Sequence, residues 1–291
     1  MSLVSKKIFY VWFGGKKPAM VNMCINNWRE KMPDYEIIEI NEKSPYFDFK
    51  KAYQTCAWFR TVYDRKMWAF VADYARCKVL YDYGGIYLDT DITICKNLSE
   101  LPANGFCCAE EKEGLINAAV VICKPKYALL RDLLHFYHNE IFDSPLYTIP
   151  AIMSYLITKN KYKNLNVYPR EYFYPYYPFE PYYEDFRPEC ITPETYTIHW
   201  WNASWVSEDN YTFLTTKHLK NVSQEINCRV RNTVSYKLFS FFPIYSKKQK
   251  NGKIYYSWFG IPLLKIRKMA DEITTKYYVL GLPILQLRKR V

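Results

Sequence analysis

Near the start of the chain, the spacing of apolar residues changes from that of a strand to that of a helix and then back to that of a strand. Residues 7–13 form a mainly apolar run that stops at two glycines. Apolar side chains then recur at roughly helical spacing over residues 18–31, and residues 35–40 form a second apolar run. The order strand, helix, strand at this spacing predicts a βαβ unit that opens a mostly parallel sheet.

The same pattern predicts four further elements. Residues 66–83 are apolar on nearly every side and precede a double glycine, the usual signal for the end of a helix. Residues 86–88 and 116–123 predict buried strands, and residues 127–142 predict another helix. We therefore expect an α/β domain in which helices flank a Rossmann-like, mixed and mostly parallel sheet.

The apolar residues of the segment 168–186 follow neither helical nor strand spacing. Ten of these nineteen residues are Tyr or Phe and four are Pro, a composition that excludes a regular helix or a central strand. It predicts an ordered aromatic loop. We expect most of its rings to pack on the domain, and the alternative is that a few line a carbohydrate cleft.

The last part of the chain contains a repeat. Each unit is apolar in its middle and basic at its end, which predicts a strand and turn that cannot bury its apolar face alone. A degenerate third copy lies at residues 241–244. Tyr256, Gly260, Pro262, Leu264, Ile266, Arg267 and Lys268 recur 21 residues later as Tyr277, Gly281, Pro283, Leu285, Leu287, Arg288 and Lys289.

Charge separates this tail from the rest of the chain. The 291 residues carry a net charge of +11, and 12 Lys or Arg against 2 Asp or Glu fall within residues 236–291. We therefore predict a nearly neutral domain over residues 1–235 and a small, basic, β-rich appendage over residues 236–291. The appendage lacks the Arg-rich or recognition-helix patterns of nucleic-acid binding, so we expect no nucleic-acid partner.

The pattern of cysteines and the lack of a recognisable signal peptide predict a reducing cellular compartment. Nine cysteines contain no Cys-X-X-Cys pair, and the first residues do not resemble a signal peptide. Reduced thiols in the cytoplasm are the expected state. No apolar run approaches the roughly 20 residues that a membrane-spanning helix needs, so any contact with a membrane would be peripheral.

Two carboxylates follow the strand at residues 86–88. Asp89 and Asp91 are one residue apart, so on an extended chain both side chains point the same way. Carboxylates at the end of a buried strand are costly unless a cation accompanies them. Oxygen ligands of this kind suit Mg²⁺ or Mn²⁺ shared with substrate phosphates. The alternative is a surface turn with two solvated acids.

The preceding helix adds a second pair of charges. Asp73 and Arg76 are three residues apart and share a helix face. Because the helix is so apolar, we expect a partly buried ion pair at a cleft instead of a solvated one. Together with the two acids after the strand, this pair supplies the metal ligands, cation and carboxylate that phosphate chemistry uses.

Aromatic residues flank this constellation. Trp12 ends the first predicted strand, at the edge where open α/β sheets bind ligands, and either stacks on a base or packs in the core. Farther along, His199 precedes Trp200 and Trp201, with Ser204 and Trp205 close behind. Such a histidine can complete the coordination of a metal, or it can be a hydrogen-bonded core residue.

Three segments together resemble glycosyltransferase family 32, which includes bacterial capsule and lipopolysaccharide enzymes and is distantly similar to the glucosylating clostridial toxins. The resemblance extends from about residue 7 to residue 205. It implies a GT-A fold, a nucleotide-sugar donor, Mn²⁺ or Mg²⁺, and transfer with retention of anomeric configuration. The segments are Tyr10-Val11-Trp12-Phe13-Gly14-Gly15, Trp68 to Arg76, and Tyr83-Gly84-Gly85-Ile86-Tyr87-Leu88-Asp89-Thr90-Asp91.

The resemblance also implies roles for single residues. It places Asp91 on the metal that binds the diphosphate, Asp89 on the ribose or the metal, and His199 as a further metal ligand. In this family another histidine commonly follows this one, whereas Trp200 follows here. The remaining donor contacts are Asp73 and Arg76 on the sugar hydroxyls, Trp12 on the base, Tyr87 on the donor, and Asn117 near the sugar or the acceptor.

These expectations lead to a specific function. A hexose would move from a nucleotide sugar to a glycan or an undecaprenyl-linked oligosaccharide in bacterial surface polysaccharide synthesis. UDP is favoured over GDP because the context of Trp12 is shared with users of UDP-sugars. The basic tail resembles units on bacterial polysaccharide transferases and suits either the anionic inner face of the cytoplasmic membrane or a sister subunit.

Two other classes of protein compete with this interpretation. Asp89-Thr90-Asp91-Ile92-Thr93 also fits the motif of haloacid-dehalogenase-type phosphatases, in which the first Asp is a nucleophile. Those enzymes need a later acidic motif, and the chain contains neither Gly-Asp nor Asp-Asp. A carbohydrate-binding protein without catalysis would need no metal at the two acids.

Overall fold

The computed structural model describes residues 4–101, 105–178, 186–202, 210, 213–215 and 217–218, and the backbone of six later strands between residues 234 and 288. The chain divides into two compact units, residues 1–218 and 219–291. The sequence placed a domain boundary between residues 235 and 236, and that boundary stays a prediction.

The first unit is built on a six-stranded mixed sheet with the strand order β2-β1-β3-β6-β5-β7. The pairs β1–β2, β1–β3 and β5–β7 are parallel, while β6 runs antiparallel to both of its neighbours. A separate antiparallel pair, β4–β8, lies outside this sheet. The strands are β1 (Lys7–Val11), β2 (Glu36–Ile40), β3 (Gly85–Leu88), β4 (Ile92–Ile94), β5 (Phe106–Lys112), β6 (Leu115–Cys123), β7 (Leu165–Tyr168) and β8 (Thr197–His199).

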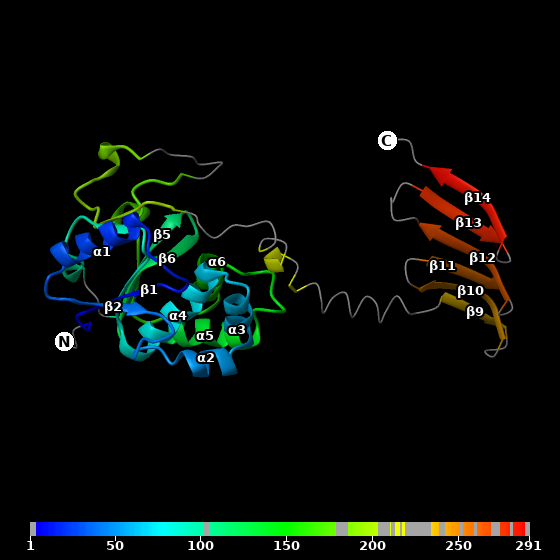
Figure 1. Ribbon diagram of the computed structural model, residues 1–291, viewed down its shortest axis with the longest axis horizontal. Helices are drawn as coiled ribbons and strands as arrows, with labels where there is room; N and C mark the ends of the chain where they lie inside the picture. Colours follow the sequence, from blue (N-terminus) through cyan, green and yellow to red (C-terminus); the bar gives the residue numbers. More distant parts are fainter. Residues whose placement is uncertain are drawn as a thin grey trace. The chain divides into compact units, whose positions relative to one another are not determined.

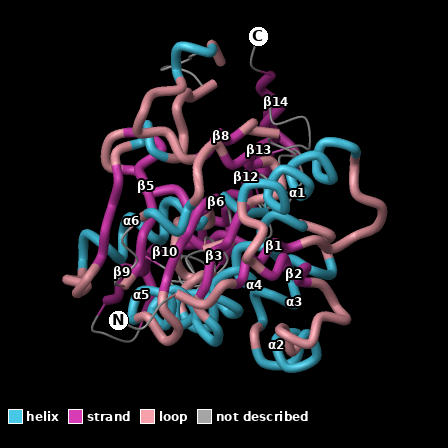
Figure 2. The backbone as a smooth tube through the Cα atoms, turned by 90° about the vertical axis from the view of Figure 1, so that its left-hand side faces the viewer, coloured by secondary structure: helices cyan, strands magenta, loops and turns pink. Residues whose placement is uncertain are grey.

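Helices cover both faces of this sheet (Figures 1 and 2). None of the helices in the described residues is long and apolar enough to cross a membrane. The α-helices are α1 (Ala19–Lys31), α2 (Phe49–Thr55), α3 (Ala57–Asp64), α4 (Trp68–Tyr83), α5 (Ala128–Asn139) and α6 (Ile149–Lys159), and the short 3-10 helices are η1 (Leu98–Glu100), η2 (Arg170–Tyr172) and η3 (Pro188–Cys190).

Successive residues of the central strands enter two different hydrophobic cores. Phe9 of β1 and Tyr87 of β3 pack in the core that helices α2 to α6 cover. Ile8 and Ile86, their neighbours in sequence, pack on the opposite face with α1. Side chains of a strand alternate between the faces of a sheet, so a strand buried on both faces appears as a continuous apolar run.

The double glycine after α4 fixes how the helix leads into β3. Gly84 has φ 61°, and a Cβ there would lie 2.7 Å from the ring of Pro125. Gly85 has φ 112°, and a Cβ there would lie 2.8 Å from the carbonyl oxygen of Lys7. Glycine alone tolerates these backbone angles and this close approach. The chain therefore turns directly from the helix into a central strand.

The α/β class and the mixed, mostly parallel sheet are confirmed, and several elements were not anticipated. The sequence pattern did not predict α2, α3, α6, β4, β5, β7 or β8. Polar and aromatic residues are mixed without a clear period in the segment of α2 and α3, where the side chains of Asp48 and Cys56 cap the helix starts. Residues 168–178 contain only the end of β7 and the short helix η2, as expected of an aromatic loop.

The second unit is a single six-stranded antiparallel sheet with consecutive strands side by side, in the order β14-β13-β12-β11-β10-β9. The first repeat of the sequence joins β11 to β12, and the second joins β13 to β14. Gly260, Gly281 and Lys289 of the repeats lie outside the described residues. The strands are β9 (Val234–Leu238), β10 (Phe242–Lys250), β11 (Lys253–Trp258), β12 (Ile261–Lys268), β13 (Thr274–Val279) and β14 (Leu282–Arg288).

Helix α1 offers a direct test of how the sheet is held in place. Trp28 is fully buried, packs on Tyr10, and donates a hydrogen bond from its indole nitrogen to the carbonyl oxygen of Ile92, at 2.8 Å. We expect Trp28→Ala to lower the free energy of unfolding by about 3–5 kcal/mol in urea titrations, through a cavity and an unpaired carbonyl. Met23→Ala, on the exposed side of the same helix, should change it by less than about 0.5 kcal/mol. Equal effects of the two substitutions would contradict this assignment of the core.

Candidate active site

The predicted site residues gather where β1 and β3 end. These strands are parallel, with Phe9 opposite Tyr87, so the residues that follow them emerge at the same edge of the sheet. Trp12 follows β1 there, and Asp89 and Asp91 follow β3. Crevices at the carboxyl ends of strands are the usual ligand sites of open α/β sheets.

A buried guanidinium organises this edge. Arg76 of α4 lies 3.1 Å from a carboxylate oxygen of Asp73 and 3.1 Å from one of Asp89. It also donates a hydrogen bond to the carbonyl oxygen of Ala118, at 2.9 Å, and it stacks over the ring of Tyr87, with its central carbon 4.5 Å from the ring centroid. One permanent cation thus joins the helix, the strand β3 and the strand β6.

Burial at this edge changes the pKa of Asp73. Its side chain is buried, as is that of Arg76. Removal from water raises the pKa of Asp73 to about 7, against the opposing effect of Arg76, and the nearby charge of Asp89 raises it further. The backbone N–H of Ile149, at the start of α6, donates to its carboxylate. The ion pair that the sequence predicted on one helix face is therefore present, and it is more deeply buried than expected.

Asp89 is held from several directions. The hydroxyl of Tyr87 donates to one of its oxygens, at 2.8 Å, and its backbone N–H donates to the carbonyl oxygen of Ala119, at 2.8 Å. Arg76 reaches both oxygens, the second at 3.4 Å. The orientation of this carboxylate is therefore fixed before any ligand arrives. Tyr87 contacts the aspartate directly, and its contact with the donor stays a prediction.

The pairing of β4 with β8 brings His199 to Asp91. Ile92 lies opposite His199 in this antiparallel pair, so the histidine sits beside the acid that precedes β4. Its Nε2 atom lies 3.2 Å from a carboxylate oxygen of Asp91. The other oxygen of Asp91 accepts from the backbone N–H of Asn202, at 2.9 Å. Burial alone would raise the pKa of Asp91, but His199 and this N–H outweigh it and lower the pKa.

Asp89, Asp91 and His199 form a group that can hold a metal ion. Each offers a ligand atom, and these atoms all lie within 4.8 Å of one another. Two carboxylates and an imidazole fit Mn²⁺ well, whereas Mg²⁺ prefers oxygen ligands alone. The ring nitrogen that faces Asp91 is Nε2, at 3.2 Å, so this atom could join the carboxylates as a ligand. The donor set therefore fits a divalent ion.

Asn117 belongs to a buried pair that the sequence analysis did not identify. Its side-chain oxygen accepts from the N–H of Ala119, at 2.7 Å, and its nitrogen donates to the carboxylate of Glu111, at 2.5 Å. Glu111 lies near the end of β5, and burial raises its pKa. The hydrogen bond from Asn117, and after it the charge of His199, counteract part of this rise. Hydrogen bonds through Asn117 and Ala119 connect Glu111 to Asp89.

The sequence contained a weak signal for Glu111. Two adjacent carboxylates, Glu110 and Glu111, follow an apolar strand-like run at residues 106–109, much as Asp89 and Asp91 follow β3. The strand itself was not predicted, and the pairing of β5 with β6, with Ala109 opposite Asn117, is what brings the acid and the amide together. This proximity is a consequence of tertiary structure.

Aromatic side chains cover the histidine. The ring of Trp201 lies 4.0 Å from that of His199, and its indole nitrogen donates to the carbonyl oxygen of Tyr176. Trp200 donates from its indole nitrogen to the hydroxyl of Thr93, at 3.0 Å. The aromatic loop and the segment after β8 therefore pack together over this group. Ser204 and Trp205, which the sequence associated with it, lie outside the described residues.

Trp12 is partly exposed at the same edge. Its backbone N–H donates to the carbonyl oxygen of Ile40, at 2.9 Å, and its indole nitrogen donates to the carbonyl oxygen of Gly15, at 2.9 Å. Both bonds fix the ring within the loop after β1. The side chain packs against the core that α1 covers while remaining partly exposed, and the base-stacking role stays a prediction.

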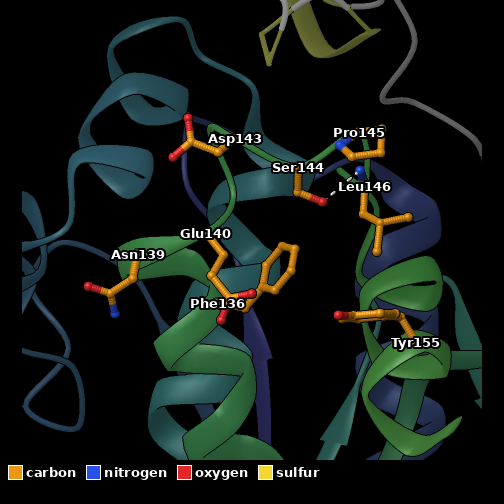
Figure 3. A pocket seen from close by; sticks show the side chains of 8 residues that line it. All are labelled: Phe136, Asn139, Glu140, Asp143, Ser144, Pro145, Leu146 and Tyr155. Carbon is orange, nitrogen blue, oxygen red and sulfur yellow. Dashed lines mark hydrogen bonds between the residues drawn. The ribbon is translucent and has the colours of Figure 1, made fainter. Parts of the chain in front are cut away.

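The structure contains one well-defined hollow away from this site (Figure 3). It has a volume of about 550 Å³ and lies between the end of α5 and helix α6. It contains none of the residues predicted to bind metal or donor, so we do not assign the reaction to it. Its lining residues are Phe136, Asn139, Glu140, Asp143, Ser144, Pro145, Leu146 and Tyr155.

Comparisons with known proteins agree with this site. Residues 18–106 match the protein family described as "Glycosyltransferase sugar-binding region containing DXD motif". Lactosylceramide 4-alpha-galactosyltransferase of Mus musculus is 27% identical over 151 residues, which are 45% of this chain and 40% of the mouse protein. The Homo sapiens protein of the same name is 24% identical over 151 residues, 45% of this chain and 41% of its own. The chain thus spans about two fifths of the length of these relatives.

Two solved structures are similar to part of the chain at low sequence identity. PaToxG glycosyltransferase has a TM-score of 0.45 and 18% identity, over 54% of this chain and 68% of its own. The galactosyltransferase LgtC, solved with donor and acceptor sugar analogs, has a TM-score of 0.39 and 14% identity, over 72% of this chain and 95% of its own. The family match spans α4, Asp89 and Asp91 and confirms the resemblance to glycosyltransferase family 32.

The raised pKa of Asp73 predicts an unusual dependence of stability on pH. Between its ordinary value of 3.8 and about 7, the folded state binds a proton that the unfolded state has released. The contribution of this group to the free energy of unfolding should therefore decrease as pH rises, by up to about 1.4 kcal/mol per pH unit. Urea titrations without added metal should show wild type losing stability relative to Asp73→Asn across this window.

Asp82, at the end of the same helix, provides the matched control. Although its partial burial favours the protonated form, hydrogen bonds from Lys126 and Lys78 outweigh this and lower its pKa. Its contribution is present above pH 3.8 and is lost only as pH falls below that value. Asp82→Asn should therefore show no trend between pH 4 and 7. If the difference in free energy of unfolding between wild type and Asp73→Asn did not change with pH, it would contradict the burial of an incompletely compensated carboxyl at position 73.

Proposed function

We propose that this chain, which contains the DXD-type glycosyltransferase region, transfers a hexose from a nucleotide sugar to a glycan, with a divalent metal and with retention of configuration. The observation that supports this most is the grouping of Asp89, Asp91 and His199 at the edge of the sheet. Mn²⁺ suits this donor set, and a UDP-hexose is favoured over GDP-mannose as donor.

The charge balance supports the requirement for a metal. Four acids are fixed around this edge, and Arg76 is the one guanidinium that pairs with any of them among the described residues. A dication would offset the excess of negative charge and allow a diphosphate to approach. When bound, the ion would stabilise the negative charge that develops on the leaving nucleotide. The acids are Asp73, Asp89, Asp91 and Glu111.

The residues of this chain would orient the donor. Asp91 and His199 would hold the ion, and Arg76 would keep Asp89 aimed at the ion or the ribose through its bidentate contact. Trp12 would stack on the base from the end of β1. Asp73 would fix a sugar hydroxyl, in line with the resemblance to family 32.

Retention of configuration follows most simply from a front-face displacement. The described site contains no carboxylate that is an evident covalent nucleophile, because each of the four acids has a partner. Asp73 and Asp89 pair with Arg76, Asp91 pairs with His199, and Glu111 accepts a hydrogen bond from Asn117. The bond from the sugar to the diphosphate oxygen would break first, and an acceptor hydroxyl would then form the new bond on the side that the nucleotide leaves. The amide of Asn117, held by Glu111, is placed to contact the sugar or the acceptor.

The phosphatase alternative receives no support from this geometry. That chemistry would require a free Asp89 to attack phosphorus. Both of its oxygens are instead occupied, one by Arg76 and the other by Arg76 and Tyr87. A carboxylate with its lone pairs engaged in this way is a poor nucleophile and a good fixed ligand.

The acceptor and location extend the proposal. We infer a glycan or undecaprenyl-linked oligosaccharide acceptor in the synthesis of bacterial surface polysaccharide, such as capsule or O-antigen. The enzyme would work at the inner face of the cytoplasmic membrane as a peripheral protein. The name of the mammalian relatives includes a glycolipid, lactosylceramide, and the basic second unit suits an anionic surface.

A donor screen tests the reaction. We expect nucleotide release in the presence of Mn²⁺ from one or more of UDP-galactose, UDP-glucose, UDP-N-acetylhexosamines and GDP-mannose, and its loss with a chelator. Asp91→Asn should reduce the rate on the order of a hundredfold or more, because a ligand of the ion is lost. Asp82→Asn, which removes an acid remote from the site, should retain the wild-type rate.

Other results of these assays would distinguish the proposed transferase from a phosphatase and from a carbohydrate-binding protein. Release that is insensitive to chelator, or full activity of Asp91→Asn, would refute the metal assignment. Release of inorganic phosphate from phosphate monoesters would favour a phosphatase. Binding of sugar without turnover of any donor would favour a carbohydrate-binding protein.

A further inference from the structure

The strand register of the second unit separates its charges from its apolar residues. In antiparallel sheets, residues directly opposite each other lie on the same face, and residues two apart along a strand share that face. The pairings across β10, β11, β12 and β13 are regular over several residues before the bulges. The face on which each residue lies follows from these pairings.

One face carries a row of cations that crosses four strands. Lys250 is opposite Lys253, Lys253 is opposite Arg267, and Arg267 is opposite Lys276. The next row on the same face alternates lysine with tyrosine. It consists of Lys248, Tyr255, Lys265 and Tyr278. We call these two rows the cationic face.

The opposite face is mainly apolar. Ile254 is opposite Ile266, which is opposite Tyr277, and Tyr277 is opposite Leu285 of β14. Two lysines also fall on this face, Lys247 opposite Tyr256 and Lys268 opposite Thr275. The segregation is therefore strong although the linear sequence mixes the two kinds of residue.

The cationic face has no internal compensation. The strands β9 to β14 contain no Asp or Glu. Like charges directly opposite each other destabilise a sheet, and neighbouring strands are only about 4.8 Å apart. A row of four cations is therefore costly in isolation. An anionic surface that meets the whole face would relieve this cost.

We propose that the cationic face is the surface by which this protein binds the anionic lipid headgroups of a membrane. The cations form a two-dimensional array on a sheet, which matches headgroups spread over a plane. Most of these cations are Lys, whereas nucleic-acid recognition relies more on the fork of Arg. Tyr255 and Tyr278 lie among them, and tyrosine is enriched at the level of lipid headgroups. The proposal specifies the membrane contact of the proposed function and is independent of the donor chemistry.

The experiment compares two pairs of substitutions that change the charge equally. Lys253→Gln with Arg267→Gln removes two cations from the cationic face, and Lys247→Gln with Lys268→Gln removes two from the opposite face. Sedimentation of the full chain with vesicles would measure binding to phosphatidylcholine alone and with about one third phosphatidylglycerol. Wild type should bind only the anionic vesicles, and less well at high salt.

The two variants should then differ. The first should bind the anionic vesicles roughly thirtyfold more weakly, as expected for two lost basic contacts. The second should lose about threefold or less, since its cations do not meet the surface. The first variant should also be at least as resistant to thermal unfolding as wild type, because a like-charge contact is removed. That result excludes misfolding as the cause of weaker binding.

Several results would overturn the proposal. Equal losses in both variants would mean that only net charge matters, and tighter binding to a duplex oligonucleotide than to anionic vesicles would point to nucleic acid instead. Donor hydrolysis with Mn²⁺, measured on the same preparations, should be unchanged in both variants. Intact hydrolysis without vesicle binding would overturn this inference alone, whereas vesicle binding without hydrolysis would overturn only the proposed function.

Discussion

The architecture of this site depends on one buried guanidinium that two carboxylates share. Arg76 is almost entirely buried, and a buried charge is tolerated only when charged or polar groups surround it. Asp73, Asp89, the carbonyl oxygen of Ala118 and the ring of Tyr87 meet that need. Because these groups come from a helix and two strands, satisfying the cation also fixes the acid that faces the ligand.

The second constraint is the negative charge of the carboxylates that Arg76 does not fully compensate. Burial raises the pKa of Asp73, because Arg76, which also pairs with Asp89, offsets only part of the removal from water. Asp91 has His199 as its partner, a group whose other ring nitrogen is buried without a bond among the described residues. An edge with this imbalance is prepared for a divalent cation and an anionic substrate, which is what transfer from a nucleotide diphosphate requires.

The two units differ in the sign and the arrangement of their charged residues. The first concentrates negative charge in a small, ordered site at the end of a buried strand. The second spreads positive charge over one face of an open sheet, with the row from Lys250 to Lys276 as its centre. A transferase whose acceptor is carried on a lipid would use both, since the proposed roles are donor binding for the first unit and membrane binding for the second.

The sequence by itself determined the elements and the chemistry that are local in the chain. The apolar run before Asp89 and Asp91, the double glycine, and the spacing of Asp73 and Arg76 predicted the strand, the helix end and the shared face, because strand and helix periodicities act over a few residues. Tertiary structure alone decided what long-range pairing creates. It brought His199 to Asp91, placed Glu111 against Asn117, and divided the basic tail into two faces. Strand register joins residues far apart in sequence, and no local pattern specifies it.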